Sequence, residues 1–290
     1  MKALEFYSGI GGLHLALSQS NAPASVTHAF DWDQNACEVY SANFGPGITK
    51  KMDISTLTAS YLAQINASLW LLSPACQPYT VLNPSAKGGL DPRATSFLHL
   101  VQDVLPELAR VDAHPTHFLV ENVGGFENSS TRHVLVSTLR SLEYTTLRYI
   151  PGRGDATWVD LRLVDPESNP DDTDGIHEIR EYLDPEPVEG YGIPDKRSGS
   201  ILKMNEEQDV VHLISPQSSS TSADAVRTLD TLRLQYFSPE ELLRLFSFTL
   251  PRSSSDPPEQ TFIWPEGISR KTKYLLIGNI NLIQYLFEEP

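Results

Sequence analysis

The chain has 290 residues, 40% of them hydrophobic, with 37 acidic against 22 basic side chains and a formal net charge of −15. This composition supports a globular core, in one large domain or in a large domain beside a smaller one. No apolar stretch approaches the roughly 20 residues that span a bilayer and the N-terminus lacks a charged-then-apolar leader, so we expect a cytoplasmic or nuclear protein.

Residues 1 to about 150 alternate strand-like and helix-like stretches, which predicts an α/β domain with a doubly wound, mostly parallel sheet of the Rossmann-like type. The expected strands are 3–7, 26–31, 69–73 and 118–121. The expected helices are 12–20, 34–43, 96–105 and 130–142. Parallel sheets of this kind place ligands and catalytic groups at the carboxyl ends of their strands, so the residues after each strand are the first to inspect.

Most of the negative charge lies in one later segment. Residues 155–190 hold twelve acidic residues against Arg162 and Arg180, which leaves 25 acidic and 20 basic residues elsewhere. The segment is also rich in proline, which indicates a surface insertion more than a core element. The overall acidity argues against a nucleic-acid partner, but its concentration in one segment weakens that objection.

The C-terminal half shows fewer regular patterns. Residues 215–222 are of low complexity and 253–258 form a second loop-like stretch. Between them, Ser238 with the acidic residues after it predicts a capped helix running through 242–246. We expect a closing helix after Gly278-Asn279.

A glycine-rich turn, 8–12, follows the first predicted strand. Glycine lets such a turn be tight and lets backbone amides approach a ligand, whether a pyrophosphate or the amino-acid end of a methyl donor. Asp31, twenty residues after Gly11, imitates a dinucleotide fingerprint, but that fingerprint needs glycine where His14 stands, which argues against NAD. Asp31 would accept hydrogen bonds from a ribose diol, and Asp53 would hold an adenine. Taken separately, the turn also fits a structural role and each aspartate a capping or surface role.

A thiol and a carboxylate follow two other predicted strands. Cys76 stands between Pro74 and Pro78 after the apolar run 69–72, and Glu121 follows the apolar run 118–120. A lone cysteine is often a small buried hydrophobe, but a rigid turn at a strand end is a place where a thiolate becomes available. A structural Glu121 would bury a charge without an evident partner, so a functional carboxylate is the better interpretation. The other cysteine, Cys37, lies on a predicted helix face, and two cysteines with eight histidines at no ligand spacing predict neither a disulfide framework nor a metal site.

These segments together resemble the cytosine carbon-5 methyltransferases, which transfer a methyl group from S-adenosylmethionine through a covalent cysteine adduct. Residues 6–12 resemble the cofactor loop of that family, 74–78 its catalytic loop and 121–123 its acidic motif. Residues 96–98, 121–132, 232–241 and 274–279 are similar to the small eukaryotic branch that methylates aspartate tRNA in its anticodon loop. The resemblance covers residues 1 to about 150 and about 229 to the end.

The resemblance implies a role for each matched segment. Cys76 would add to carbon 6 of a flipped-out cytosine while Glu121 protonates the ring nitrogen. The residues expected to bind S-adenosylmethionine are Tyr7, Ser8, Gly9, Ile10, Gly11, Gly12, Asp31, Trp32, Asp53, Ile54, Pro74 and Asn279. The residues expected to bind the substrate are Gln77, Asn122 and Arg162. The expected domains are a cofactor-binding and catalytic domain (1–150), an acidic recognition region (151–228) and a C-terminal segment that returns to the first domain (229–290), in a monomer whose partner is tRNA.

Several positions depart from the family pattern. The arginine-x-arginine strand has only Leu161-Arg162-Leu163 as a remnant, Ala75 replaces a proline, and Gly278-Asn279-Ile280 replaces a glycine-asparagine-serine. A second hypothesis is therefore a degenerate relative that binds cofactor or RNA without turnover. A DNA methyltransferase is a third, although the chain has no basic stripe to follow a duplex, and a nicotinamide dehydrogenase is a fourth.

Overall fold

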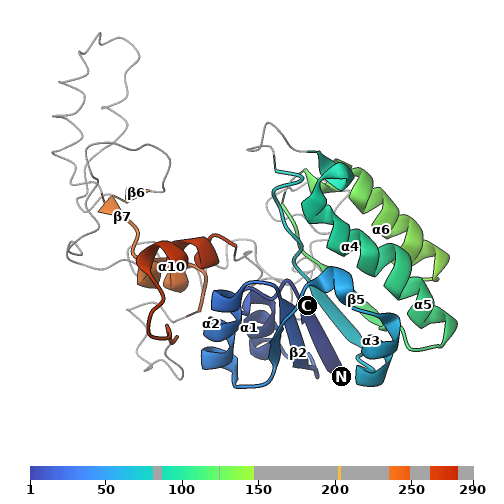
Figure 1. The fold of residues 1–290 in the computed structure, drawn as a ribbon, viewed down its shortest axis with the longest axis horizontal. Coiled ribbons are helices and arrows are strands. Elements are labelled where there is room, and N and C mark those ends of the chain that lie inside the picture. Colours follow the sequence, from blue (N-terminus) through green and yellow to red (C-terminus); the bar gives the residue numbers. More distant parts are fainter. Residues whose placement is uncertain (81–86, 124, 147–201, 204–234, 249–261, 280–290) are drawn as a thin grey trace, which may run out of the picture. The chain divides into compact units, whose positions relative to one another are not determined.

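The computed structural model describes residues 1–80, 87–123, 125–146, 202–203, 235–248 and 262–279 (Figure 1). The chain divides into two compact units, one made of residues 1–172 and 262–290 and the other of residues 173–261. Much of the predicted recognition region, 151–228, lies outside the described residues, so its boundaries stay a prediction.

The first unit is built on a five-stranded sheet in the order β3-β2-β1-β4-β5, with every pair parallel. The strands are β1 (Lys2–Phe6), β2 (Ser25–Asp31), β3 (Thr49–Lys51), β4 (Leu69–Leu72) and β5 (His117–Val120). The chain winds from β1 outward to β3 and then returns to the other side of β1 for β4 and β5, which confirms the predicted doubly wound sheet. The direction of winding reverses between β1 and β4, where such sheets bind ligands.

Helices cover both faces of this sheet (Figure 1). Successive side chains of a strand point to opposite faces, so Ala3 packs in the layer of α1 and α2, whereas Leu4 and Phe6 pack in the layer of α3 to α6. The helices are α1 (Gly12–Gln19), α2 (Gln34–Phe44), α3 (Ala59–Ile65), α4 (Thr95–His99), α5 (Leu105–Arg110) and α6 (Ser130–Ser141). All four residues of β4 are buried, as expected for a central strand covered on both faces.

Two elements of this domain were not predicted. β3 consists of Thr49, Lys50 and Lys51, which have no apolar run and become a strand by pairing with β2. The second is α3, which is short but has ordinary boundary signals: Thr58 accepts a hydrogen bond from the Tyr61 amide at its start, and Asn66 ends it in a left-handed conformation.

The predicted helix 96–105 is confirmed but is longer, because α4 continues through a π-helical turn, Leu100–Val104, into α5. Pro106 lies just inside α5 and has no N–H to donate to the preceding turn. In the wider turn before it, the Leu105 amide donates to the Leu100 carbonyl, five residues back. The helix thus passes the proline by changing its hydrogen-bond register, as π-helical turns do.

The second unit contains a short antiparallel pair, β6 (Leu202–Lys203) with β7 (Gln235–Tyr236), and the helix α9 (Pro239–Leu245). The predicted cap is confirmed as a reciprocal pair: the Glu241 amide donates to Ser238 Oγ at 3.1 Å, and the Ser238 amide donates to Glu241 Oε2 at 2.8 Å.

The C-terminal part of the first unit contains α10 (Arg270–Ile277), which was not predicted. The helix expected after Gly278-Asn279 lies outside the described residues. Two hydrogen bonds join this part to α2, since Asn43 Nδ2 donates to the Ile263 carbonyl at 2.9 Å and the Ile263 amide donates to Asn43 Oδ1 at 2.7 Å. Among the helices that the structure describes, none has the length and apolar character of a membrane span.

Candidate active site

The glycine turn after β1 has a backbone that needs glycine. Gly9 and Gly11 have φ values of +51° and +94°, and a Cβ atom on Gly11 would collide with the Phe44 ring. The Gly9 amide donates to Asp31 Oδ2 at 2.8 Å, which ties the turn to the carboxyl end of β2. Tyr7, at φ +58°, begins the turn, so three alternate residues of the segment 7–11 adopt left-handed backbone conformations at the switch point of the sheet.

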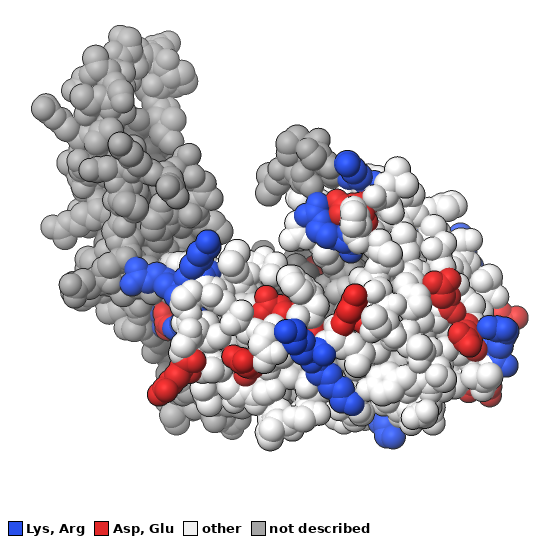
Figure 2. Space-filling model, viewed as in Figure 1, with Lys and Arg blue, Asp and Glu red and all other residues white. Residues whose placement is uncertain are grey.

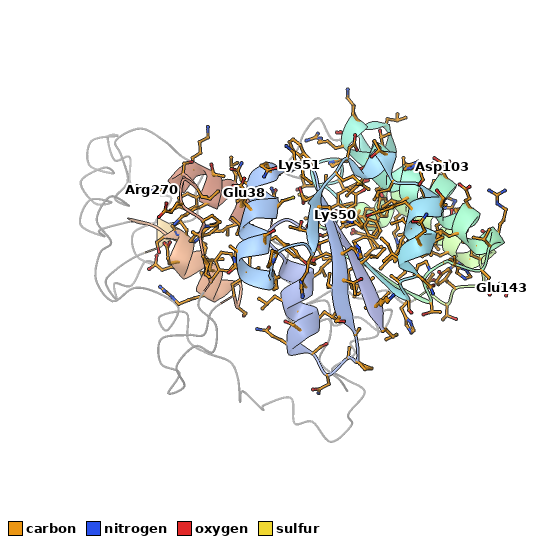
Figure 3. The ribbon with its side chains drawn as sticks, turned by 60° about the horizontal axis from the view of Figure 1, so that its bottom comes forward. Glu38, Lys50, Lys51, Asp103, Glu143 and Arg270 are labelled. Atoms are coloured by element: carbon orange, nitrogen blue, oxygen red, sulfur yellow. The ribbon has the colours of Figure 1, made fainter. Side chains whose placement is uncertain are left out.

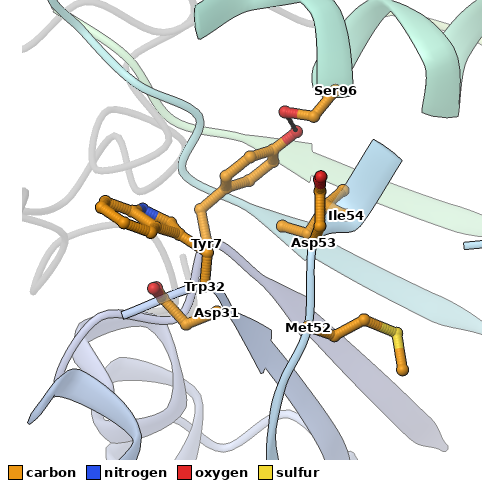
Figure 4. Close-up of a pocket in the computed structure, with 7 residues that line it drawn as sticks. All are labelled: Tyr7, Asp31, Trp32, Met52, Asp53, Ile54 and Ser96. Atoms are coloured by element: carbon orange, nitrogen blue, oxygen red, sulfur yellow. Dashed lines mark hydrogen bonds between the residues drawn. The ribbon is translucent and has the colours of Figure 1, made fainter. Parts of the chain in front are cut away.

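A cavity of about 340 Å³ opens beside this turn, lined by Tyr7, Asp31, Trp32, Met52, Asp53, Ile54 and Ser96 (Figure 4). Five of these are residues that the sequence predicted for the cofactor, and they come from the ends of β1, β2 and β3. The Tyr7 hydroxyl lies 3.0 Å from Ser96 Oγ across the cavity. Trp32 is 73% exposed, so its flat apolar ring is available for stacking with a ligand ring.

Sequence reasoning missed Met52 and Ser96 as cavity residues. Met52 follows the unpredicted strand β3, and Ser96 lies in the first turn of α4 on the opposite side of the cavity. A serine near a predicted helix start is a weak signal, because it is more often a cap. Only the fold brings Ser96 to Tyr7, which is 89 positions earlier in the chain.

The two cavity aspartates are held differently. Asp31 is buried, which raises the pKa of its carboxyl, while its oxygens accept the amides of Gly9 at 2.8 Å and Asp33 at 2.9 Å. The pKa of Asp53 is lowered, because its carboxylate accepts from the Ser55 hydroxyl at 2.7 Å and from the Ser55 amide at 2.9 Å. Both offer oxygen acceptors to a ligand in the cavity.

The donors and acceptors around the cavity fit an adenosyl group. Carboxylates accept from ribose hydroxyls or an adenine amine, and the apolar faces of Trp32 and Ile54 suit a flat ring. Ser8, the first residue of the turn, is buried, and its hydroxyl has no hydrogen-bond partner among the described residues. A buried hydroxyl in that condition is satisfied at low cost by a polar ligand.

The remaining predicted cofactor residues lie elsewhere. Ile10 is 1% exposed, so only its backbone is available to a ligand, and Gly12 begins α1. Pro74 is buried directly after β4, and Asn279 is exposed beyond the end of α10. Neither Pro74 nor Asn279 lines the cavity.

Cys76 and Glu121 follow neighbouring parallel strands, β4 and β5. The Glu121 amide donates to the Leu72 carbonyl at 2.9 Å and extends the ladder by one bond, and Asn122 Nδ2 donates to the Pro74 carbonyl at 2.9 Å. The two strand ends are thereby tied together. Gln77 is partly buried in the turn after Cys76, and Arg162 lies outside the described residues.

Electrostatics link the thiol to the carboxylate. Burial raises the pKa of Cys76, the Glu121 charge raises it further, and the Arg93 guanidinium lowers it. Cys76 is only half-buried, so the thiol is reachable. The Glu121 charge therefore acts on the Cys76 thiol, and so does the Arg93 cation, which the sequence did not single out.

Arg93 is held in place by Asp91. Its Nε and Nη2 donate to the two Asp91 carboxylate oxygens at 2.9 and 2.7 Å, and the pKa of Asp91 is about 2 as a result. Asp91 caps the short helical turn 92–94. Three residues earlier, the Gly88 amide donates a hydrogen bond to the Pro78 carbonyl of the cysteine loop at 3.0 Å. The sequence alone gives no signal for this ion pair near the cysteine loop, because an Asp-Pro-Arg run also fits an ordinary surface turn.

Charged side chains of both signs lie on the face that Figure 2 shows. Lys and Arg form several groups there, Asp and Glu side chains lie between some of them, and no basic stripe crosses the described part of that face. Figure 3 shows Lys50 and Lys51 on β3 and Glu38 on the neighbouring α2. In the part of the chain that the structure describes, no group of His, Cys, Asp and Glu side chains is arranged to hold a metal ion.

Known proteins are similar to this chain in sequence and in fold. A tRNA (cytosine(38)-C(5))-methyltransferase of Schizosaccharomyces pombe is 29% identical over 99% of this chain and 95% of its own length. A protein of the same name from Bos taurus is 42% identical over 49% of this chain and 35% of its own length. The crystal structure of the S. pombe Dnmt2 methyltransferase superposes with a TM-score of 0.68 at 26% identity, covering 99% of this chain and 97% of that one.

The family model of the C-5 cytosine-specific DNA methylases matches residues 1–149, about half of the 290 residues. The matched segment contains the glycine turn, the whole parallel sheet, and the strand ends that carry Cys76 and Glu121. The match confirms the family expected from the motifs. The chain belongs to the C-5 cytosine-specific DNA methylase family.

Proposed function

We propose that this protein methylates carbon 5 of a cytosine in tRNA, with S-adenosylmethionine as the methyl donor and the anticodon loop of aspartate tRNA as the target. The observation that carries the proposal is the placement of Cys76 and Glu121 at adjacent strand ends beside the turn that borders the cavity. Ser73 Oγ donates to the Tyr7 carbonyl at 3.1 Å, so the loop that leads to Cys76 touches a residue that lines the cavity. The names of the similar proteins support tRNA as the substrate class.

The chemistry follows from the two groups. Cys76, as a thiolate, forms a bond to carbon 6 of the cytosine, and Glu121 donates a proton to the ring nitrogen as electron density moves onto the ring. Carbon 5 thereby becomes nucleophilic. The cofactor, when bound, supplies an activated methyl group for that carbon. Loss of the carbon 5 proton to water then expels the Cys76 thiolate, and the proton on the ring nitrogen returns to Glu121, which restores the neutral aromatic ring.

The cofactor would be held at the cavity. Asp31 would accept from the ribose hydroxyls, Asp53 from the adenine amine, and Trp32 with Ile54 would contact the ring. The glycine turn would present its amides to the amino-acid end. The target cytosine must leave its stack to reach a thiol at a strand end, which favours a loop or single-stranded target over a duplex.

The first prediction tests the nucleophile. Cys76→Ala removes the attacking atom, so transfer of tritiated methyl groups to tRNA should fall below detection, while Cys37→Ala, which removes a buried thiol on α2, should keep near-normal transfer. If Cys76→Ala transferred methyl groups as fast as the unaltered protein, the assigned chemistry would be wrong. A parallel assay on duplex DNA separates the two nucleic-acid substrates.

The replaced motif residues favour a second candidate, a protein that binds cofactor or RNA without turnover. Ala75 replaces a proline in the cysteine loop, and Asn279, which matches the C-terminal motif, is exposed and does not line the cavity. Calorimetry with S-adenosylmethionine, followed by the tritium assay on tRNA, decides between the two candidates. Binding without any transfer would support the second.

A further inference from the structure

A carboxyl group lies in the core behind the glycine turn. Glu5, in the central strand β1, is 1% exposed and points into the layer of α1 and α2, where its sheet neighbours are Ala29 and Leu71. A buried carboxyl is costly unless it is hydrogen-bonded. The proposed methyl-transfer chemistry does not use it, so its partners show what it does.

Glu5 has partners on both helices. Its Oε1 accepts the backbone amide of His14 at 3.3 Å, and its Oε2 accepts the Tyr40 hydroxyl at 2.8 Å. His14 Nδ1 lies 2.7 Å from the same hydroxyl, and the His14 ring stacks on Phe44 at 4.3 Å between centroids. The carboxyl thus joins the first turn of α1 to the middle of α2.

The first turn of α1 needs this partner. Its N-cap is Gly11, which has no side chain to accept from the amides of the first turn, and the first turn contains no acidic residue. The Glu5 side chain, which projects from the sheet, takes the place of a cap: its carboxyl accepts hydrogen bonds from the His14 and Leu13 amides. Phe44, packed against Gly11, closes the same end of the helix. The glycine turn is therefore held by Asp31 on one side and by Glu5 on the other.

We propose that Glu5 is a positioning residue for the methyl donor, because it holds the first turn of α1, and through it the glycine turn 8–12, in the shape that binds S-adenosylmethionine. Its protonation changes that affinity. The inference rests on the proposed cofactor. An ionised Glu5 cancels part of the positive potential that the amides at the start of α1 offer to the cofactor carboxylate, whereas a neutral Glu5 leaves it intact.

The charge of Glu5 changes in an accessible range. Burial raises its pKa to about 8, against hydrogen bonds from Tyr40, His14 and Leu13 that lower it, and the Asp31 charge raises it slightly. Among the described residues that face it, the titratable groups are Tyr40, His14 and Asp31. Burial raises the pKa of Tyr40 further above its ordinary value and lowers that of His14 to about 4, so neither changes charge where Glu5 does.

Amide hydrogen exchange in the protein without cofactor tests the holding contact. Glu5→Ala should speed exchange at Leu13 and His14 by about tenfold or more relative to the rest of α1, because their acceptor is gone. Glu5→Gln keeps one accepting oxygen and should restore protection. Tyr40→Phe should give a smaller increase, and Tyr61→Phe, which removes a tyrosine hydroxyl bonded to Lys50 on the other face of the sheet, should give none. Unchanged exchange at Leu13 and His14 in both Glu5→Ala and Tyr40→Phe overturns the proposal, and Tyr40→Phe keeps the test open should Glu5→Ala not fold.

Calorimetry with S-adenosylmethionine from about pH 6 to pH 9 tests the effect of protonation. Relative to Glu5→Gln at the same pH, the unaltered protein should lose about twofold to fivefold in affinity across this range, the size expected for one charge at a helix terminus. The amino group of the cofactor titrates in the same range, and the comparison at equal pH removes its contribution. Parallel profiles for the two proteins overturn the proposal, and Glu38→Gln, an exposed glutamate on α2, should behave as the unaltered protein. Absence of any binding by the unaltered protein would instead refute the proposed function, while the exchange experiment still decides whether Glu5 holds the turn.

Discussion

A negative and a positive group both act on the pKa of Cys76. Burial and the Glu121 carboxylate raise the pKa of its thiol, and the Arg93 guanidinium, fixed by two hydrogen bonds to Asp91, lowers it. The thiolate is the nucleophile, so burial, a backbone hydrogen bond at Cys76 and these two charges together set how much of the protein is reactive at neutral pH.

The second prediction separates these charges. In a Cys37→Ala background, the rate of Cys76 alkylation by iodoacetamide is measured against pH. Glu121→Gln should move the midpoint to lower pH and Arg93→Gln to higher pH, because each removes one of the two opposing charges. Lys87→Gln, which removes an exposed cation from the same loop region, is the control and should leave the midpoint in place. Identical midpoints in the Cys37→Ala protein and its three variants would show that neither Glu121 nor Arg93 acts on the pKa of Cys76.

Among the elements, the turn from β1 into α1 is the most constrained. It combines left-handed glycines with a helix start whose N-cap has no side chain, and it packs against Phe44. Its shape depends on α2 and β2 as much as on its own residues.

The third prediction concerns that packing. Gly11→Ala should destabilise the protein by more than the roughly 1–2 kcal/mol that a left-handed alanine costs, since its Cβ would also collide with the Phe44 ring. Gly47→Ala is the matched control, with φ +88° and open space around the added atom, and should show the conformational cost alone. Urea unfolding gives both values. Equal losses for the two variants would show that Phe44 moves aside freely.

For the whole molecule, the buried Glu5 and the partly buried His14 make the free energy of unfolding depend on pH. The pKa of Glu5 is raised in the folded chain to about 8 from 4.5, so its stabilising contribution is complete below about 4.5 and is lost as the pH rises through 8. The pKa of His14 is lowered to about 4 from 6.5, so its contribution is present above 6.5 and is lost as the pH falls through 4. Between about pH 4.5 and 6.5, the effects of Glu5 and His14 on the free energy of unfolding therefore oppose each other.

The fourth prediction follows from these two slopes. The free energy of unfolding should change little between about pH 4.5 and 6.5 from this pair, and should fall between 6.5 and 8, by about 1.4 kcal/mol for each pH unit at most. Glu5→Gln should abolish the fall above pH 6.5. Urea unfolding at closely spaced pH values measures it, and a fall that persists in Glu5→Gln would assign the effect to other groups.

Apolar patterning made much of the first domain predictable. The strands β1, β2, β4 and β5 and the helices α1, α2 and α6 were located to within a residue or two, because strands and helix faces that pack in the core are rich in apolar residues. The same reasoning missed β3, whose Thr-Lys-Lys sequence is a strand only through its neighbour β2, and α10, whose mixed composition gives little periodic signal. Short elements depend on tertiary contacts more than on propensity.

The amino-acid sequence by itself determined the family, the order of the main strands and the chemical groups at their ends, because glycine turns, apolar runs and a cysteine between prolines are local patterns. The tertiary structure decided which distant groups act on one another. Arg93 lowers the pKa of Cys76, Ser96 forms a hydrogen bond with Tyr7, and Glu5 accepts a hydrogen bond from the first turn of α1. Such pairings arise when separate segments pack against one sheet, so the spacing of residues along the chain does not predict them.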